Sequence, residues 1–155
     1  MKAKALVLVV GLVASAALAQ KVASFSGSWE FRPEKSKNVG MMAQMKITET
    51  IALSGSALDI VDRSLNQGQE NEIKTHYDLD GKVASNQSPM AGPSETVSRW
   101  EGGKLITTWT SESAIAGGPK VVRTETRYVS PDGKTMTVES VRGSNAPVVI
   151  VFDRK

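Results

Sequence analysis

The chain has 155 residues and a formal net charge of +3, from 19 basic and 16 acidic residues, with one histidine and no cysteine. This length fits one ordinary domain and excludes two-domain enzyme architectures. The lack of cysteine excludes disulfides and thiol catalysis, and a single histidine excludes most zinc sites. Lys2 and Lys4 fall in an N-terminal leader, so 17 basic residues remain against 16 acidic ones. A nucleic-acid-binding protein would carry a larger basic excess.

Residues 1–19 are predicted to form a cleaved signal peptide. Its positive start is followed by an apolar stretch over residues 5–16 and by the small-x-small cleavage motif Ala17-Leu18-Ala19. The apolar run, about 15 residues, is shorter than the roughly 20 residues that cross a bilayer. We therefore expect cleavage after Ala19, a single mature domain over residues 20–155 without a membrane span, and a periplasmic or secreted location.

Alternation of apolar and polar side chains with period 2 dominates from Phe25 onward, and helical periodicity never exceeds about two turns. The chain is therefore predicted to be all-β. The expected strands cover residues 24–32, 45–53, 57–65, 71–79, 95–101, 104–112, 121–129, 134–141 and 148–154. Residues 33–43 have room for at most one short helical turn, and residues 85–93 are predicted to be a mobile loop.

Short turns join these strands, among them Ser54-Gly55, Asp80-Gly81 and Pro131-Asp132-Gly133. Sequential antiparallel strands form an up-and-down meander, and closing it hides its edges. We expect 8–9 strands closed into a barrel. A two-sheet β-sandwich stays open as the alternative, because turn spacing alone does not separate the two folds.

The segment Phe25-Ser26-Gly27-Ser28-Trp29 resembles the Gly-x-Trp pattern of lipocalins and the Phe-x-Gly-x-Trp pattern of fatty-acid-binding proteins. Residues 99–105 resemble a hairpin of the latter group. The order of Gly-x-Trp, Pro33–Lys37, Ser130–Val138 and Val148–Arg154 is similar to that of small exported bacterial lipocalin-like proteins, which have no assigned activity. This resemblance implies a calycin-type barrel in which Gly27, Trp29 and Arg154 form a structural signature, with Arg154 stacked on Trp29.

Two departures from fatty-acid-binding proteins matter for function. Residues 33–43 are too few to build their helix-turn-helix lid. Ile150 and Phe152 stand where the resemblance implies an Arg-x-Tyr pair that grips a carboxylate. A buried carboxylate needs such a paired donor, so the sequence lacks the fatty-acid anchor.

Alternation assigns seven large side chains to the inner face of the barrel: Phe25, Trp29, Phe31, Tyr77, Trp109, Met136 and Phe152. An eight-stranded barrel is either filled by side chains or holds one small ligand. The residues expected to line a ligand are Tyr77, Trp109, Tyr128, Met136 and Phe152, with residues 85–93 at the mouth.

Arg123, Glu125 and Arg127 alternate along one strand face. Because buried charges are rare, we predict that this face is solvated and that Tyr128 lies on the inner face. The alternative is that the three charged side chains line a pocket for an acidic ligand.

No catalytic or metal-binding pattern emerges from the sequence. His76 shares strand parity with Glu72, Lys74 and Asp78 and is predicted to face solvent, without a nucleophile elbow in the chain. Asp78-x-Asp80-Gly81 lacks the later ligands of a calcium loop and is predicted to be a turn. We expect no enzyme activity, no metal and no cofactor.

The sequence as a whole favours an exported lipocalin-like protein that binds a small apolar or amphipathic molecule inside the barrel. A packed scaffold or interaction module of the cell envelope is the alternative, and a small barrel enzyme is the third reading. We expect no nucleic-acid partner, and we expect no membrane-spanning segment in the mature chain. Partner proteins are not identified by the sequence.

Overall fold

A computed structural model describes residues 24–88 and 91–155, so the predicted signal peptide lies outside the described residues. Within those ranges, no helix is long and apolar enough to span a membrane. The strands are β1 (Gly27–Phe31), β2 (Lys46–Ser54), β3 (Ala57–Asn66), β4 (Gln69–Asp78), β5 (Val83–Ser88), β6 (Gly92–Glu101), β7 (Lys104–Ser111), β8 (Val121–Val129), β9 (Thr135–Arg142) and β10 (Val148–Arg154). Two short 3-10 turns, η1 (Pro33–Lys35) and η2 (Gly40–Gln44), separate β1 from β2.

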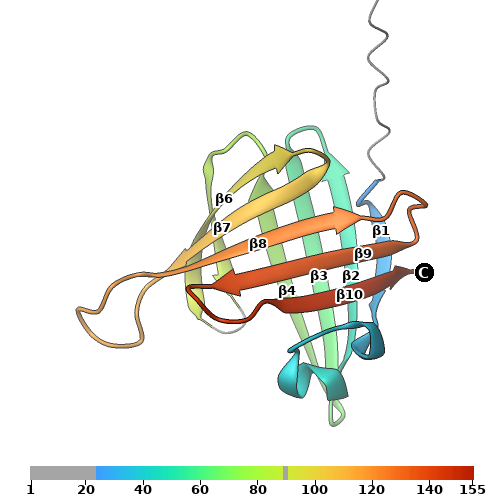
Figure 1. Cartoon of the computed structure of the whole chain (residues 1–155), viewed down its shortest axis with the longest axis horizontal. Helices are drawn as coiled ribbons and strands as arrows, with labels where there is room; N and C mark the ends of the chain where they lie inside the picture. The colour runs from blue at the N-terminus through green and yellow to red at the C-terminus, as the bar shows by residue number, and fades with distance from the viewer. Residues whose placement is uncertain (1–23, 89–90) are drawn as a thin grey trace, which may run out of the picture.

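All ten strands belong to one antiparallel sheet in the order β4-β3-β2-β1-β10-β9-β8-β7-β6-β5. The first strand pairs with the last, with Trp29 opposite Arg154 and Phe31 opposite Phe152. Figure 1 shows the sheet curling on itself into a barrel. The predicted all-β meander and barrel are confirmed, and the sandwich alternative is wrong.

The barrel closes without a backbone ladder between its two edge strands, β4 and β5. The side chain of Asn86 on β5 bridges them: its amide donates to the carbonyl of His76 (2.8 Å), and its oxygen accepts from the His76 N–H (2.9 Å). The same amide donates to Thr96 Oγ1 on β6 (2.7 Å). We call this junction the β4–β5 seam.

The structure has ten strands where 8–9 were predicted, and the strand that was not predicted is β5. Residues 85–93, predicted to be a mobile loop, contain most of β5 and the start of β6, which pair from Val83↔Val97 to Ser88↔Gly92. The buried side chains of β5 are the small polar Asn86 and Ser88, so the strand shows no alternation of apolar and polar residues. Residues 89–90 of the predicted mouth lie outside the described residues.

The connections also differ in part from expectation. Residues 33–43 contain two 3-10 turns rather than at most one helical turn. They lie at one end of the barrel, tied to β10 by the bridge between Lys37 and Val149 (Figure 1). The turn at Asp80-Gly81 forms as predicted, but the strands on its two sides do not pair with each other.

The inner face carries the core, and all seven large side chains assigned to it are buried. The predicted contact between Arg154 and Trp29 is confirmed: the guanidinium lies 4.1 Å from the ring centroid. Arg154 also donates to the carbonyls of Ser24, Ser26 and Gly133. Gly27 has φ +131, and an added Cβ would lie 2.7 Å from the Arg154 guanidinium, so this position requires glycine.

The prediction for β8 is wrong, because its faces are reversed. Glu125 and Arg127 are buried on the inner face and Arg123 is partly buried, whereas Tyr128 lies on the outer face beneath Lys104. The hydroxyl of Tyr128 donates to Glu139 (2.8 Å). Pairing with β9 explains this, since Arg127 stands opposite the inward Val138 and Tyr128 opposite Thr137.

Candidate ligand-binding site

Arg127 is the centre of a charged network inside the barrel. Its guanidinium donates to Glu49 Oε2 on β2 (2.5 Å), lies 3.4 Å from Glu125 Oε1, and contacts the sulfur of Met136 (3.5 Å). Both carboxylates are buried. Burial alone would lower the pKa of Arg127, and the two carboxylates raise it above its ordinary value. Arg127 is therefore a fixed cation whose charge is already matched.

Tyr77 links this network to an aromatic cluster. Its hydroxyl donates to Glu125 Oε1 (3.2 Å), and its ring meets Trp109 edge to face at 5.9 Å. Burial and the Glu125 carboxylate raise the pKa of Tyr77, so the hydroxyl stays protonated. Arg123 lies 4.6 Å from the Trp109 ring and 3.8 Å from Glu125. Aromatic surface and charge thus meet in one region of the interior.

Asp62 is a third carboxyl group of this interior. It stands directly opposite Glu49 on the β2–β3 ladder. Burial, followed by the neighbouring Glu49 carboxylate, raises the pKa of Asp62 to about 8. At neutral pH these effects favour the protonated form of Asp62.

Two buried N–H donors in this region have no acceptor among the described residues: Nε1 of Trp109 and Nε of Arg127. Both side chains are almost fully buried and lie on the inner faces of the adjacent strands β7 and β8. Leaving such a donor unpaired costs about 1–3 kcal/mol, and native proteins pair nearly all of them. These atoms indicate where an oxygen atom of a ligand would be accommodated.

Small polar side chains cover the wall of the barrel next to this network. On the inner faces of β6 and β7 the hydroxyls pair with each other, Ser94 with Ser111 (2.7 Å) and Ser98 with Thr107 (2.9 Å). Their polar groups are satisfied, and their side chains are short. This wall therefore fills less of the barrel interior than aromatic or branched apolar residues would.

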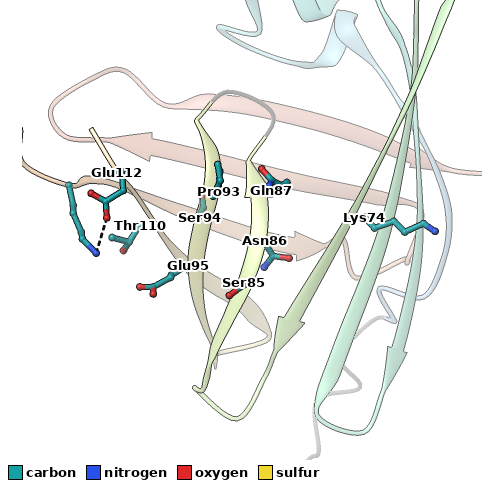
Figure 2. A pocket seen from close by; sticks show the side chains of 10 residues that line it. Lys74, Ser85, Asn86, Gln87, Pro93, Ser94, Glu95, Thr110 and Glu112 are labelled. Atoms are coloured by element: carbon teal, nitrogen blue, oxygen red, sulfur yellow. Dashed lines mark ion pairs between the residues drawn. The ribbon is translucent and has the colours of Figure 1, made fainter. Parts of the chain in front are cut away.

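A depression of about 470 Å³ opens on the outside of the barrel near the β4–β5 seam, and its lining includes the buried Asn86 and Ser94. Its lining comes largely from outward residues such as Ser85, Gln87 and Glu95, and an ion pair between Lys120 and Glu112 (3.2 Å) stands at its rim, as Figure 2 shows. Another depression, of about 340 Å³, is lined by residues of β2, β3 and β4. Neither includes a predicted ligand-binding residue.

The structure brings four of the five predicted ligand-binding residues to the inner face: Tyr77, Trp109, Met136 and Phe152. Tyr77 and Trp109 contact each other, Met136 contacts Arg127, and Phe152 packs on Phe31. Tyr128 lies outside. Sequence reasoning missed the inward orientation of the acidic residues on β2, β3 and β8. Met136 is predicted to point inward, and Val129 stands opposite it on β8. Since alternate residues of a strand share a face, this register places Arg127 inward too.

The remaining polar motifs lie on the outer surface. His76 faces solvent, as predicted, and its Nδ1 lies 2.7 Å from Asp59. In the described ranges, no three His, Cys, Asp or Glu side chains are arranged to hold a metal ion.

No protein-family model matches the chain, and no curated protein matches it either. Solved structures match its fold. A Schistosoma mansoni fatty acid binding protein in complex with arachidonic acid is 17% identical, with TM-score 0.65, covering 86% of this chain and 98% of that one. Fatty-acid-binding protein 1 of Echinococcus granulosus is 14% identical, with TM-score 0.61, and the fluorescent protein UnaG N57A mutant is 14% identical, with TM-score 0.62. Both matches cover 84% of this chain and 96% of the other.

The fold is that of the fatty-acid-binding proteins. At these identities the likeness concerns the fold and not the ligand. The interior of this barrel has its own chemistry: Arg127 comes from β8 and is held between two carboxylates, and the last strand presents Ile150 and Phe152.

Proposed function

We propose that this chain binds one small amphipathic molecule inside its barrel. The observation that carries the proposal is the pair of buried donors, Trp109 Nε1 and Arg127 Nε, without acceptors among the described residues. An oxygen atom on a ligand would accept from such a donor and offset the cost of burying it.

The remaining interior supplies the apolar contacts of the proposed site. Tyr77, Trp109, Met136 and Phe152 are buried there, and the short side chains of β6 and β7 stand beside them. Pockets for small molecules combine such apolar walls with a few placed polar groups. The solved proteins of this fold include some named as fatty-acid-binding, which supports an interior ligand.

A titration of the purified protein with Nile red and decanol tests this function. Nile red is an uncharged fluorophore that brightens in apolar surroundings, and decanol should displace it with a stoichiometry of one per chain. Trp109→Phe removes one donor and keeps most of the ring, so we expect at least tenfold weaker decanol binding, corresponding to about 1.4 kcal/mol. Trp100→Phe is the matched control, because Trp100 is 39% exposed.

Absence of dye uptake and of decanol binding would contradict the proposal. That result would favour the packed barrel, an interaction module without an internal ligand.

We also propose that the chain is exported with its leader removed. The charged start, the apolar stretch and the Ala17-Leu18-Ala19 motif support this. Expressed with its own leader in a Gram-negative host, the protein should be recovered from the periplasm or medium with a mature mass beginning at Gln20. A cytoplasmic product that keeps residues 1–19 would contradict export.

A further inference from the structure

The guanidinium groups near Arg127 already pair with carboxylates, so neither is free to bind the anionic head group of a ligand. The network holds three carboxyl groups, from Glu49, Asp62 and Glu125, and two guanidinium groups, from Arg123 and Arg127. Arg127 is shared between Glu49 and Glu125, at 2.5 Å and 3.4 Å. Arg123 lies 3.8 Å from Glu125 and stacks on Trp109. Each guanidinium thus already has an anionic neighbour.

A carboxylate placed against this network would meet Glu49 and Glu125 before it met an unmatched cation. The interior already resists a further anion, because the protonated form of Asp62 is favoured at neutral pH beside Glu49. Water is excluded from a buried site, so the repulsion between like charges is screened less there than at the surface.

An ammonium head group fits the unpaired atoms poorly. Trp109 Nε1 and Arg127 Nε are both N–H donors, and an ammonium group brings only further donors. A hydroxyl, carbonyl, ester or amide oxygen accepts from them without adding charge. The unpaired donors and the paired charges therefore both favour an uncharged head group that carries an oxygen acceptor.

We propose that the barrel selects amphipathic molecules with an uncharged, oxygen-bearing head group and discriminates against carboxylates of the same chain length. This inference rests on the proposed function, since it specifies the ligand of the same interior site. It separates the chain from a fatty-acid carrier of the same fold.

Isothermal titration calorimetry at pH 7 with decanol, decanoate and decylamine tests the inference. These three probes share one alkyl chain and differ in head-group charge. We expect decanol to bind at least tenfold more tightly than either charged probe. If decanoate or decylamine binds as tightly as decanol or more tightly, the inference is overturned and interior binding stands. If none of the three binds, both the inference and the proposed function fail.

Neutralising a carboxylate partner of Arg127 tests the cause of the discrimination. Glu49→Gln alone would relieve part of the raised Asp62 pKa and let Asp62 supply the missing charge, so it is combined with Asp62→Asn. The double variant keeps both side-chain shapes and leaves Arg127 incompletely matched. We expect the ratio of decanoate affinity to decanol affinity to rise at least tenfold. Glu95→Gln is the control, because Glu95 is exposed on the outer face, and it should leave the ratio unchanged.

Glu125→Gln removes the other carboxylate partner of Arg127 and keeps the test decisive if the double variant does not fold. A folded variant of either kind, verified by circular dichroism, that still discriminates against decanoate as strongly as the unmodified protein would overturn the inference.

Discussion

Trp29 and Arg154 come from opposite ends of the described chain and hold the barrel closed. The indole Nε1 donates to the carbonyl of Phe25 (2.8 Å), and the guanidinium covers the ring face while its N–H groups donate to three carbonyls. The ring is fully buried and the polar groups of both side chains are paired. This contact therefore combines core packing with closure of the β1–β10 ladder.

Removing this ring should destabilise the fold severely. Trp29→Ala leaves a large cavity and removes the face on which Arg154 stacks, so we expect a loss of about 3–5 kcal/mol in the free energy of unfolding. Urea denaturation followed by circular dichroism measures it, with Trp100→Phe as the control. An unchanged midpoint would show that Trp29 does not carry the core.

Asp62 predicts a dependence of stability on pH. Its pKa is about 8 in the folded chain and 3.8 as the reference value for an unperturbed group, so between these values the folded state holds a proton that the unfolded state releases. Stability contributed by this group therefore falls as pH rises from about 4 to about 8. Asp62→Asn, which mimics the protonated acid, should show a shallower decline in unfolding free energy. An identical pH profile in the variant and the unmodified protein would contradict this assignment.

At the scale of residues, period-2 alternation predicted the large inward side chains but misplaced the charged ones. Alternation divides β8 into two faces but does not show which of them points into the barrel. Because buried charges are rare, the face with Tyr128 was predicted to point inward, and this was wrong. Arg127 is buried because Glu49 on β2, 78 positions away in the chain, supplies its partner. That partner leaves no local signal in the sequence, so the usable signal was the β8–β9 hairpin register, which sets Arg127 on the same face as the residue opposite the inward Met136.

At the scale of elements, the strand that escaped prediction is a short one whose buried side chains are small and polar. The inner face of β5 presents Asn86 and Ser88, whose burial is permitted by hydrogen bonds or by small size rather than by apolar character. The Asp80-Gly81 turn was predictable from its residues, but the missing ladder between β4 and β5 was not, because turn chemistry does not specify whether the flanking strands pair.

Asn86 should stabilise the seam in place of that ladder. Asn86→Ala removes its hydrogen bonds to the N–H and carbonyl of His76 and to Thr96, so we expect a loss of about 1–3 kcal/mol. The amide proton of His76 should also exchange faster with solvent, as hydrogen-exchange NMR measures. Gln87→Ala, on the exposed face of the same strand, is the control. Equal exchange rates in the two variants would mean that Asn86 does not hold the seam.

At the scale of the whole molecule, the strand order explains why a chain of this length forms a barrel without disulfides. Every strand except the β4–β5 pair is hydrogen-bonded to its neighbour in sequence, the β1–β10 ladder joins the two ends of the described chain, and the β4–β5 seam closes the barrel through the Asn86 side chain. The meander was predictable from the hairpin turns. A single continuous sheet rather than a two-sheet sandwich follows from the β1–β10 ladder, which sets Trp29 opposite Arg154. Turn spacing does not encode a pairing between strands so far apart in the chain.

The central proposal is that an uncharged amphipathic molecule binds inside this barrel, against Trp109 and Arg127. The most direct test is a ¹H–¹⁵N NMR spectrum of the protein titrated with decanol, which reports the indole Nε1–H and the arginine Nε–H individually. We expect the signal of Trp109 Nε1–H, of Arg127 Nε–H or of both to move to lower field in a saturable way as the decanol oxygen supplies an acceptor, while Trp100 is unaffected. Shifts confined to backbone amides around the outer depression at Ser85 and Glu95, or no shifts at all, would contradict an interior ligand.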